Sequence, residues 1–258
     1  MPTAAGFHYF LHEGGSLLTP PLVLIHGAGG DHLFWPPEMR RLPDYRVITL
    51  DLPGHGKTEG PGRQSVQDYA RDVAQFLDAV GLSRAVIVGH AMGGAISLAL
   101  ALDFPSRVAG IGLISTGPSL PIPSSVIENA ANLSTLPLAI KSLQNLSIGS
   151  QTPENLIGII FKRLTATRQT LLLNDLLACD RFDLSDCLNA IQTPVLVVCG
   201  TDDRLTPLHL SEVLSRKIPG AALQTIEGAG HMLVLEQPGR LAKLISVFLA
   251  TIPYSPGM

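Results

Sequence analysis

The sequence predicts an α/β protein in which a mainly parallel central sheet carries helices on both faces, with a helical segment inserted between two of its strands. Three observations lead to this fold class. Short apolar runs of strand length alternate along the 258 residues with longer segments of helical periodicity. Most of these runs lack polar alternation, which indicates strands buried on both faces. Glycine-rich turns follow several of them, at the carboxyl ends of the strands where ligand sites of such sheets form.

The core of the fold is expected in residues 1–117 and 192–258. Because 46% of all residues are hydrophobic, the chain can bury a large core and is not disordered. Strands are predicted at Leu22–Ile25, Arg46–Leu50, Ala85–Val88, Val108–Ile114, Val195–Val198 and Ala222–Ile226. Core helices are predicted at Val66–Val80, Met92–Asp103, Leu208–Lys217 and Gln237–Leu249.

Residues 118–191 contain no convincing strand, and we expect them to form a helical lid between two core strands. Helices are predicted at Ser124–Leu133, Leu138–Leu146, Pro153–Thr165 and Ala166–Leu177. The segment has more apolar side chains than one helix face needs, among them Leu156, Ile157, Ile159, Ile160, Phe161 and Leu171–Leu173. Two interpretations stay open: these side chains pack the insertion onto the core, or they line an apolar substrate pocket.

Charge and cysteine content exclude several classes of function. Eighteen Lys and Arg against 21 Asp and Glu give a net charge of -3, which offers no general attraction for nucleic acid or an anionic membrane. We therefore expect a small-molecule ligand, and the sequence carries no signal for an oligomeric state. Cys179, Cys187 and Cys199 form an odd set without CxxC spacing, so neither disulfides nor a zinc site is expected. The amino terminus lacks the pattern of a secretory signal, and a reducing, cytoplasmic setting fits best.

The segment Gly89–Gly94 has the spacing of a nucleophile elbow, GxSxG, with Ala91 at the nucleophile position. It lies between a predicted strand and a predicted helix. Flanking glycines have a steric reason, because the central residue of such a turn is strained and neighbours with a β-carbon would collide. Taken alone, this spacing is also compatible with an ordinary strand-to-helix turn.

Three other segments lie where the sheet should bring them to the same edge. His26–Gly30 follows the first strong strand, and a glycine-rich turn there can direct a backbone N–H at an oxyanion. Gly200–Arg204 and Gly228–His231 follow the last two strands. The chain order of elbow, acid and histidine is that of α/β-hydrolases and differs from the common serine-protease orders.

These motifs, together with the turn Asp51–Thr58, resemble the α/β-hydrolase superfamily, in the branch with a helical cap between the sixth and seventh strands. The resemblance covers nearly the whole chain outside the cap and implies a first strand that is short or missing. It implies that Ala91 occupies the nucleophile position, that His231 is the general base and that Asp203 orients it. Asp202 is the competing acid; Asp203 is preferred because the family acid usually stands three residues after the strand-end glycine.

The same resemblance implies that the backbone N–H groups of Met92 and Ala28 form the oxyanion hole, with Gly29 as the fallback for the second donor. Gly29, Leu205 and Met232 are candidate substrate contacts, and core packing is the alternative for Leu205 and Met232. The remaining histidines lack metal-ligand spacing and are interpreted as structural or surface residues: His8, His12, His26, His32, His55, His90 and His209. We expect no metal and no cofactor.

The methyl group of Ala91 cannot attack a carbonyl, so the chain as written should not form an acyl-enzyme. Either the alanine was introduced to trap a complex, which we favour because Asp203, His231 and the oxyanion turn are retained, or it is natural and the protein binds ligand without turnover. Serine is the expected active nucleophile rather than aspartate, since Met92 replaces the tryptophan that usually follows aspartate nucleophiles.

The sequence thus predicts a capped serine hydrolase, inactive as its Ala91 form, for an uncharged and fairly hydrophobic carboxylic ester or lactone. The cap carries both signs of charge without an excess of cations, and so shows no signal for a carboxylated substrate. Carbon–carbon bond hydrolysis, amide hydrolysis and lyase chemistry on the same triad, or a binding protein without turnover, remain the alternatives.

Overall fold

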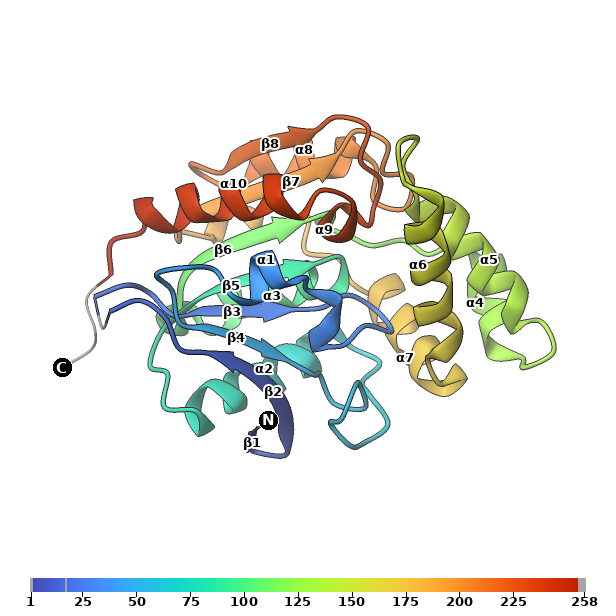
Figure 1. Ribbon diagram of the computed structural model, residues 1–258, viewed down its shortest axis with the longest axis horizontal. Coiled ribbons are helices and arrows are strands. Elements are labelled where there is room, and N and C mark those ends of the chain that lie inside the picture. The colour runs from blue at the N-terminus through green and yellow to red at the C-terminus, as the bar shows by residue number, and fades with distance from the viewer. Residues whose placement is uncertain (1, 17, 255–258) are drawn as a thin grey trace.

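The computed structural model describes residues 2–16 and 18–254, and within them an eight-stranded sheet has the order β1-β2-β4-β3-β5-β6-β7-β8 (Figure 1). The β1–β2 and β2–β4 pairs are antiparallel, and every other neighbouring pair is parallel. The strands are β1 (Thr3–Ala4), β2 (Phe7–His12), β3 (Leu22–Ile25), β4 (Val47–Leu50), β5 (Ala85–His90), β6 (Val108–Ile114), β7 (Val195–Gly200) and β8 (Ala222–Ile226).

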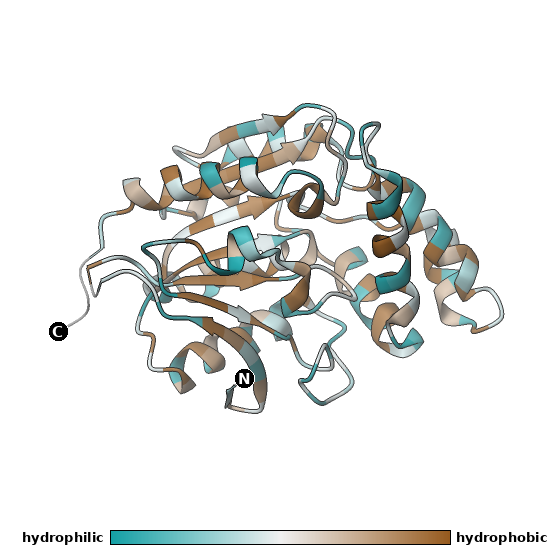
Figure 2. Ribbon diagram, in the orientation of Figure 1, coloured by the Kyte–Doolittle hydropathy of each residue, from teal (hydrophilic) through white to brown (hydrophobic). Residues whose placement is uncertain are grey.

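Every residue of the central strands β3 to β7 is buried, which is why their sequences are continuous apolar runs (Figure 2). All six predicted strands are present. One strand was not predicted: β2 lies between β1 and β4, and its sequence Phe-His-Tyr-Phe-Leu-His shows no alternation of apolar and polar residues. Its antiparallel pairing with β4 comes from tertiary context that local sequence does not report. The first strand, β1, has only two residues, in line with the expected short first strand.

Helices cover both faces of the sheet and bury separate apolar clusters against it. On one face lie α2 (Val66–Ala79), α3 (Met92–Asp103) and α8 (Leu208–Lys217); on the other lie α1 (Pro37–Arg40), α9 (Leu233–Glu236) and α10 (Pro238–Thr251). Short 3₁₀ turns at His32–Phe34, Pro105–Arg107 and Leu188–Ala190 complete this part of the chain. The predicted α/β fold class is confirmed, with all four predicted core helices present.

Four helices are inserted between β6 and β7 and lie beyond the carboxyl ends of the central strands (Figure 1). They are α4 (Ser124–Ala131), α5 (Leu136–Ser147), α6 (Glu154–Ala166) and α7 (Gln169–Asp180). Ile160 and Leu172 belong to an apolar cluster of the insertion's own, while Ile159 and Phe161 are exposed. The last helix begins at Gln169 rather than at Ala166, because Thr167 and Arg168 have extended backbones.

All three cysteines are free thiols, with Cys179 and Cys199 buried and Cys187 exposed. Among the described residues, no helix combines the length and hydrophobicity needed to cross a bilayer.

Candidate active site

The turn between β5 and α3 places Ala91 at the carboxyl edge of the sheet in a strained conformation. Its φ of 50° and ψ of -114° lie outside the regions that L-residues ordinarily occupy. Two glycines make the turn possible: a β-carbon on Gly89 would lie 2.0 Å from the Gly93 carbonyl oxygen, and one on Gly93 would lie 2.2 Å from that of Ile25. The glycine spacing seen in the sequence therefore reflects backbone contacts that exclude any side chain.

Asp203 and His231 come together from the loops that follow β7 and β8. His231 Nδ1 lies 3.0 Å from Asp203 Oδ2 and 3.2 Å from Oδ1, and both side chains are buried. With Nδ1 donating to the carboxylate, Nε2 is the ring nitrogen left to accept a proton. His231 and Ala91 line the same cavity, so this arrangement can supply a general base beside the elbow.

Thr206 holds the Asp203 carboxylate in place, a role that the sequence analysis missed. Its backbone N–H donates to Asp203 Oδ1 over 2.8 Å and its hydroxyl to Oδ2 over 2.8 Å, while Leu205 N–H donates to Oδ1 over 3.0 Å. Burial opposes ionisation of Asp203, but His231 and these hydrogen bonds prevail, so the pKa of the carboxyl lies below its usual range. A threonine three residues after an aspartate is a signal of this local turn.

Asp202, the competing acid, makes different contacts. Its Oδ2 accepts the backbone N–H of Ser150, 2.9 Å away in the loop between α5 and α6, and its Oδ1 accepts the Thr201 hydroxyl. Among the described residues, His231 bonds to Asp203 and not to Asp202. The geometry favours Asp203 as the acid and gives Asp202 a role in attaching the insertion.

At the edge of the elbow, the backbone amides of Ala28 and Met92 donate to no acceptor in the described parts of the chain. Met92 begins α3, where the helix dipole also favours negative charge. A β-carbon on Gly27 would lie 3.3 Å from that of Ala91, so the turn containing Ala28 passes directly beside the nucleophile position. The fallback donor, Gly29, is engaged elsewhere, because its N–H donates to Asp175 Oδ2 over 2.8 Å.

An apolar cavity of about 80 Å³ lies over Ala91, between the core and the insertion. Leu205 and Met232 line it beside His231, together with Leu143, Leu172 and Leu176 of the insertion. A more open pocket of about 420 Å³ adjoins it, sharing Ala28, Phe34 and Met232. This outer pocket has mixed polarity, since Gly29, Asp31, Arg163 and Arg168 contribute to its lining.

His90 packs directly behind His231. Its Nε2 donates to the His231 carbonyl oxygen over 2.9 Å, and the ring centroids lie 4.8 Å apart. Burial, together with the proximity of His231, lowers the pKa of His90 to about 3. His90 is therefore neutral and supports the loop that carries the candidate base.

His8, His32 and Asp51 form a buried cluster whose donor atoms are close enough to surround a metal ion. However, both histidines bond through Nδ1 to Asp51, over 2.7 Å and 2.9 Å, and the carboxylate also accepts the N–H groups of His32 and Lys57. These hydrogen bonds already satisfy Asp51, so the cluster is interpreted as a structural support for the turn after β4.

The chain matches the family described as alpha/beta hydrolase fold over residues 20–238. It is 32% identical over 266 residues to the putative carbamate hydrolase RutD of Caulobacter vibrioides, covering 96% of each chain. Among solved structures, Est816, described as an N-acyl homoserine lactone degrading enzyme, is 26% identical with a TM-score of 0.82 and coverage of 94% and 96%. A thermophilic esterase from Thermogutta terrifontis is 25% identical with a TM-score of 0.85 and coverage of 96% and 94%.

We expect stability to fall as the pH is lowered from 6.5 towards 4. In the unfolded chain a histidine takes up a proton near pH 6.5, whereas in the folded protein burial lowers the pKa of His90 to about 3 and that of His26 to about 4. The unfolded state then binds more protons, which costs about 1.4 kcal/mol of unfolding free energy per pH unit for each histidine. Urea unfolding at several pH values measures this slope.

The variant His90→Gln should reduce the slope of unfolding free energy against pH by about 1.4 kcal/mol per pH unit, the contribution of one histidine. The glutamine amide can still donate to the His231 carbonyl oxygen, but it does not titrate. Exposed His209 offers the matched control, and His209→Gln should leave the slope unchanged. Equal slopes for His90→Gln and the parent chain would contradict the assignment of a buried neutral His90.

Proposed function

Since the chain belongs to the α/β-hydrolase family, we propose that its site is built for serine-type hydrolysis of an uncharged, fairly hydrophobic carboxylic ester or lactone. The observation that carries this proposal is the buried Asp203–His231 pair facing an elbow residue that is flanked by two free backbone amides. The apolar cavity over Ala91 supports an acyl group or lactone ring of low polarity.

With serine at position 91, the hydroxyl oxygen would attack the substrate carbonyl while His231 Nε2 accepts its proton. The carbonyl oxygen would become an oxyanion held by the N–H groups of Ala28 and Met92. Collapse of this intermediate would release the alcohol, protonated by His231, and leave an acyl-enzyme. Water, deprotonated by His231, would then attack the acyl carbon and release the acid together with the serine.

The chain itself carries Ala91, which has no lone pair to attack with, so this covalent route is closed in it. We favour an alanine that was introduced to trap a complex, because the strained backbone, the acid, the histidine and both amides all keep the arrangement that catalysis needs. A natural alanine would instead make the protein a binder of the same class of ligand, and turnover by the serine form separates the two.

A carbamate is the second candidate substrate, because the 32% identical relative that matches along nearly its whole length is named a putative carbamate hydrolase. Attack of the serine on a carbamate carbonyl would pass through the same tetrahedral oxyanion and expel the alcohol, leaving a carbamoyl-enzyme. Water would then release carbamic acid together with the serine. The outer pocket, with Asp31, Arg163 and Arg168, offers polar groups for such a substrate that the inner cavity lacks.

The variant Ala91→Ser should hydrolyse short and medium-chain nitrophenyl esters or simple lactones, with kcat above that of the parent chain by about five to six orders of magnitude. The reason is that a hydroxyl restores the covalent route. Steady-state rates and mass detection of an acyl-enzyme measure it, with nitrophenyl carbamates in the same panel. Adding His231→Ala to the serine form should abolish turnover.

If neither the serine form nor the alanine form hydrolyses the esters, lactones or carbamates, the ester, lactone and carbamate proposals are overturned. Ala91→Asp tested on haloalkanes and epoxides would then decide whether an aspartate nucleophile suits the site instead.

In the serine form, Asp203→Asn should lower kcat by about four orders of magnitude, because the histidine loses the acceptor that sets its tautomer. Its neighbour provides the matched control: Asp202→Asn removes the same charge one residue away and should change kcat by less than about threefold. Parallel kinetics of the two variants measure the difference. A larger loss in Asp202→Asn than in Asp203→Asn would reverse the assignment of the acid.

A further inference from the structure

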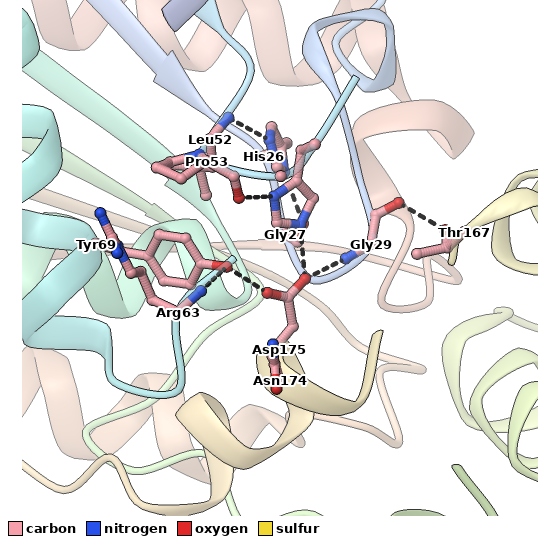
Figure 3. A network of polar contacts seen from close by, with 12 residues as sticks. His26, Gly27, Gly29, Leu52, Pro53, Arg63, Tyr69, Thr167, Asn174 and Asp175 are labelled. Atoms are coloured by element: carbon pink, nitrogen blue, oxygen red, sulfur yellow. Dashed lines mark hydrogen bonds and ion pairs between the residues drawn. The ribbon is translucent and has the colours of Figure 1, made fainter. Parts of the chain in front are cut away.

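A buried carboxylate of the insertion holds three segments of the core (Figure 3). Asp175 of α7 is fully inaccessible to solvent. Its Oδ2 accepts the N–H of Gly29 over 2.8 Å and lies 2.7 Å from His55 Nε2, while its Oδ1 accepts the Tyr69 hydroxyl over 2.7 Å. These donors come from the oxyanion turn, the turn after β4 and helix α2. Such a carboxylate in an apolar helix is costly unless all its partners are present.

The insertion forms hydrogen bonds with both the N–H group and the carbonyl oxygen of Gly29. Besides the bond from its N–H to Asp175, its carbonyl oxygen accepts the Thr167 hydroxyl over 3.0 Å (Figure 3). Gly29 has a φ of 65°, and a β-carbon there would lie 3.1 Å from Thr167 Oγ1. Two residues from the insertion thus fix the orientation of the peptide groups that follow Ala28.

The contact with His55 makes Asp175 part of a buried ion pair. The Nδ1 of His55 lies 3.1 Å from the Pro53 carbonyl oxygen and its Nε2 lies 2.7 Å from the carboxylate, so both ring nitrogens face acceptors and the surroundings favour the protonated ring. Burial opposes this charge, but Asp175 outweighs it and raises the pKa of His55. Neutral His26, whose ring centroid lies 4.7 Å away, adds no charge of its own.

We propose that Asp175 is a positioning residue for the oxyanion hole: by capturing the Gly29 amide together with Thr167, it orients the turn so that the Ala28 amide is the one presented to the substrate. This inference rests on the proposed function, because it assigns a role within the same hydrolytic site. It also means that α7 cannot separate from the core without exposing or unpairing a buried charge, so α7 is a fixed wall of the site.

The first experiment needs no turnover and uses the chain as it is. Amide hydrogen exchange should show a protected Gly29 N–H, and Asp175→Asn should speed its exchange by at least about tenfold and shift the Ala28 amide resonance. If Asp175→Asn fails to fold, Thr167→Val tests the other hydrogen bond between the insertion and Gly29, because valine keeps the side-chain shape but lacks the hydroxyl. Unchanged Gly29 exchange and Ala28 resonance in Thr167→Val and in any folded Asp175→Asn would overturn the proposal.

The second experiment places the same changes in the Ala91→Ser form. Loss of alignment of one oxyanion donor should lower kcat about 10- to 100-fold in Asp175→Asn and less in Thr167→Val, with KM changed less than about threefold. Thr165→Val is the matched control and should leave both constants unchanged, because among the described residues the Thr165 hydroxyl donates only to carbonyls of its own helix.

The two experiments distinguish failure of this inference from failure of the proposed function. If Ala91→Ser is inactive, the proposed function fails, and the exchange data alone decide whether Asp175 fixes the turn. If the serine form is active and Asp175→Asn alters Gly29 exchange without lowering kcat, the residue is merely structural and the positioning role is refuted. A rise in KM at constant kcat would refute it as well.

Discussion

The close packing of three backbones at the elbow is the constraint on which the rest of the site depends. The Gly93 carbonyl presses against Gly89, and the Ile25 carbonyl presses against Gly93, with no room for a β-carbon at either place. This contact brings the ends of β3 and β5 together and forces Ala91 into its positive φ. Because the strain arises from the packing and not from the side chain at position 91, the elbow keeps its shape with alanine in place of a nucleophile.

The insertion contributes to the site by holding each of its loops, and not only by covering it. Asp175 and Thr167 fix the oxyanion turn, and the Ser150 amide bonds to Asp202 in the acid loop. In the histidine loop, Met232 N–H donates to the Ser147 carbonyl oxygen over 3.2 Å. Both parts of the chain therefore form the cavity over Ala91, and a change in the insertion would alter the backbone of the candidate site.

Sequence reasoning was accurate where one local pattern decides the outcome. The apolar runs predicted the five buried strands β3 to β7 and also β8, which is mostly exposed, and the glycine spacing predicted the elbow. Burial on both faces and a missing β-carbon leave direct marks in the sequence. It missed β2, whose pairing depends on a distant strand. It also missed Asp175, which meets Gly29 across 146 positions of sequence. The segment Leu171–Ala178 is mostly apolar and therefore predicts a packing helix, and its one aspartate was the signal that could have indicated a buried polar role.

The distribution of charge around the site explains why neighbouring histidines differ in protonation. Hydrolysis would transiently create an imidazolium on His231, and a second cation 4.8 Å away on His90 would oppose it. Burial keeps His90 neutral and so removes this repulsion. Behind the turn after β3, the Asp175 carboxylate raises the pKa of His55 and balances the charge of its protonated ring. The developing oxyanion would then be stabilised chiefly by the two backbone amides and the start of α3, which are fixed before any substrate arrives.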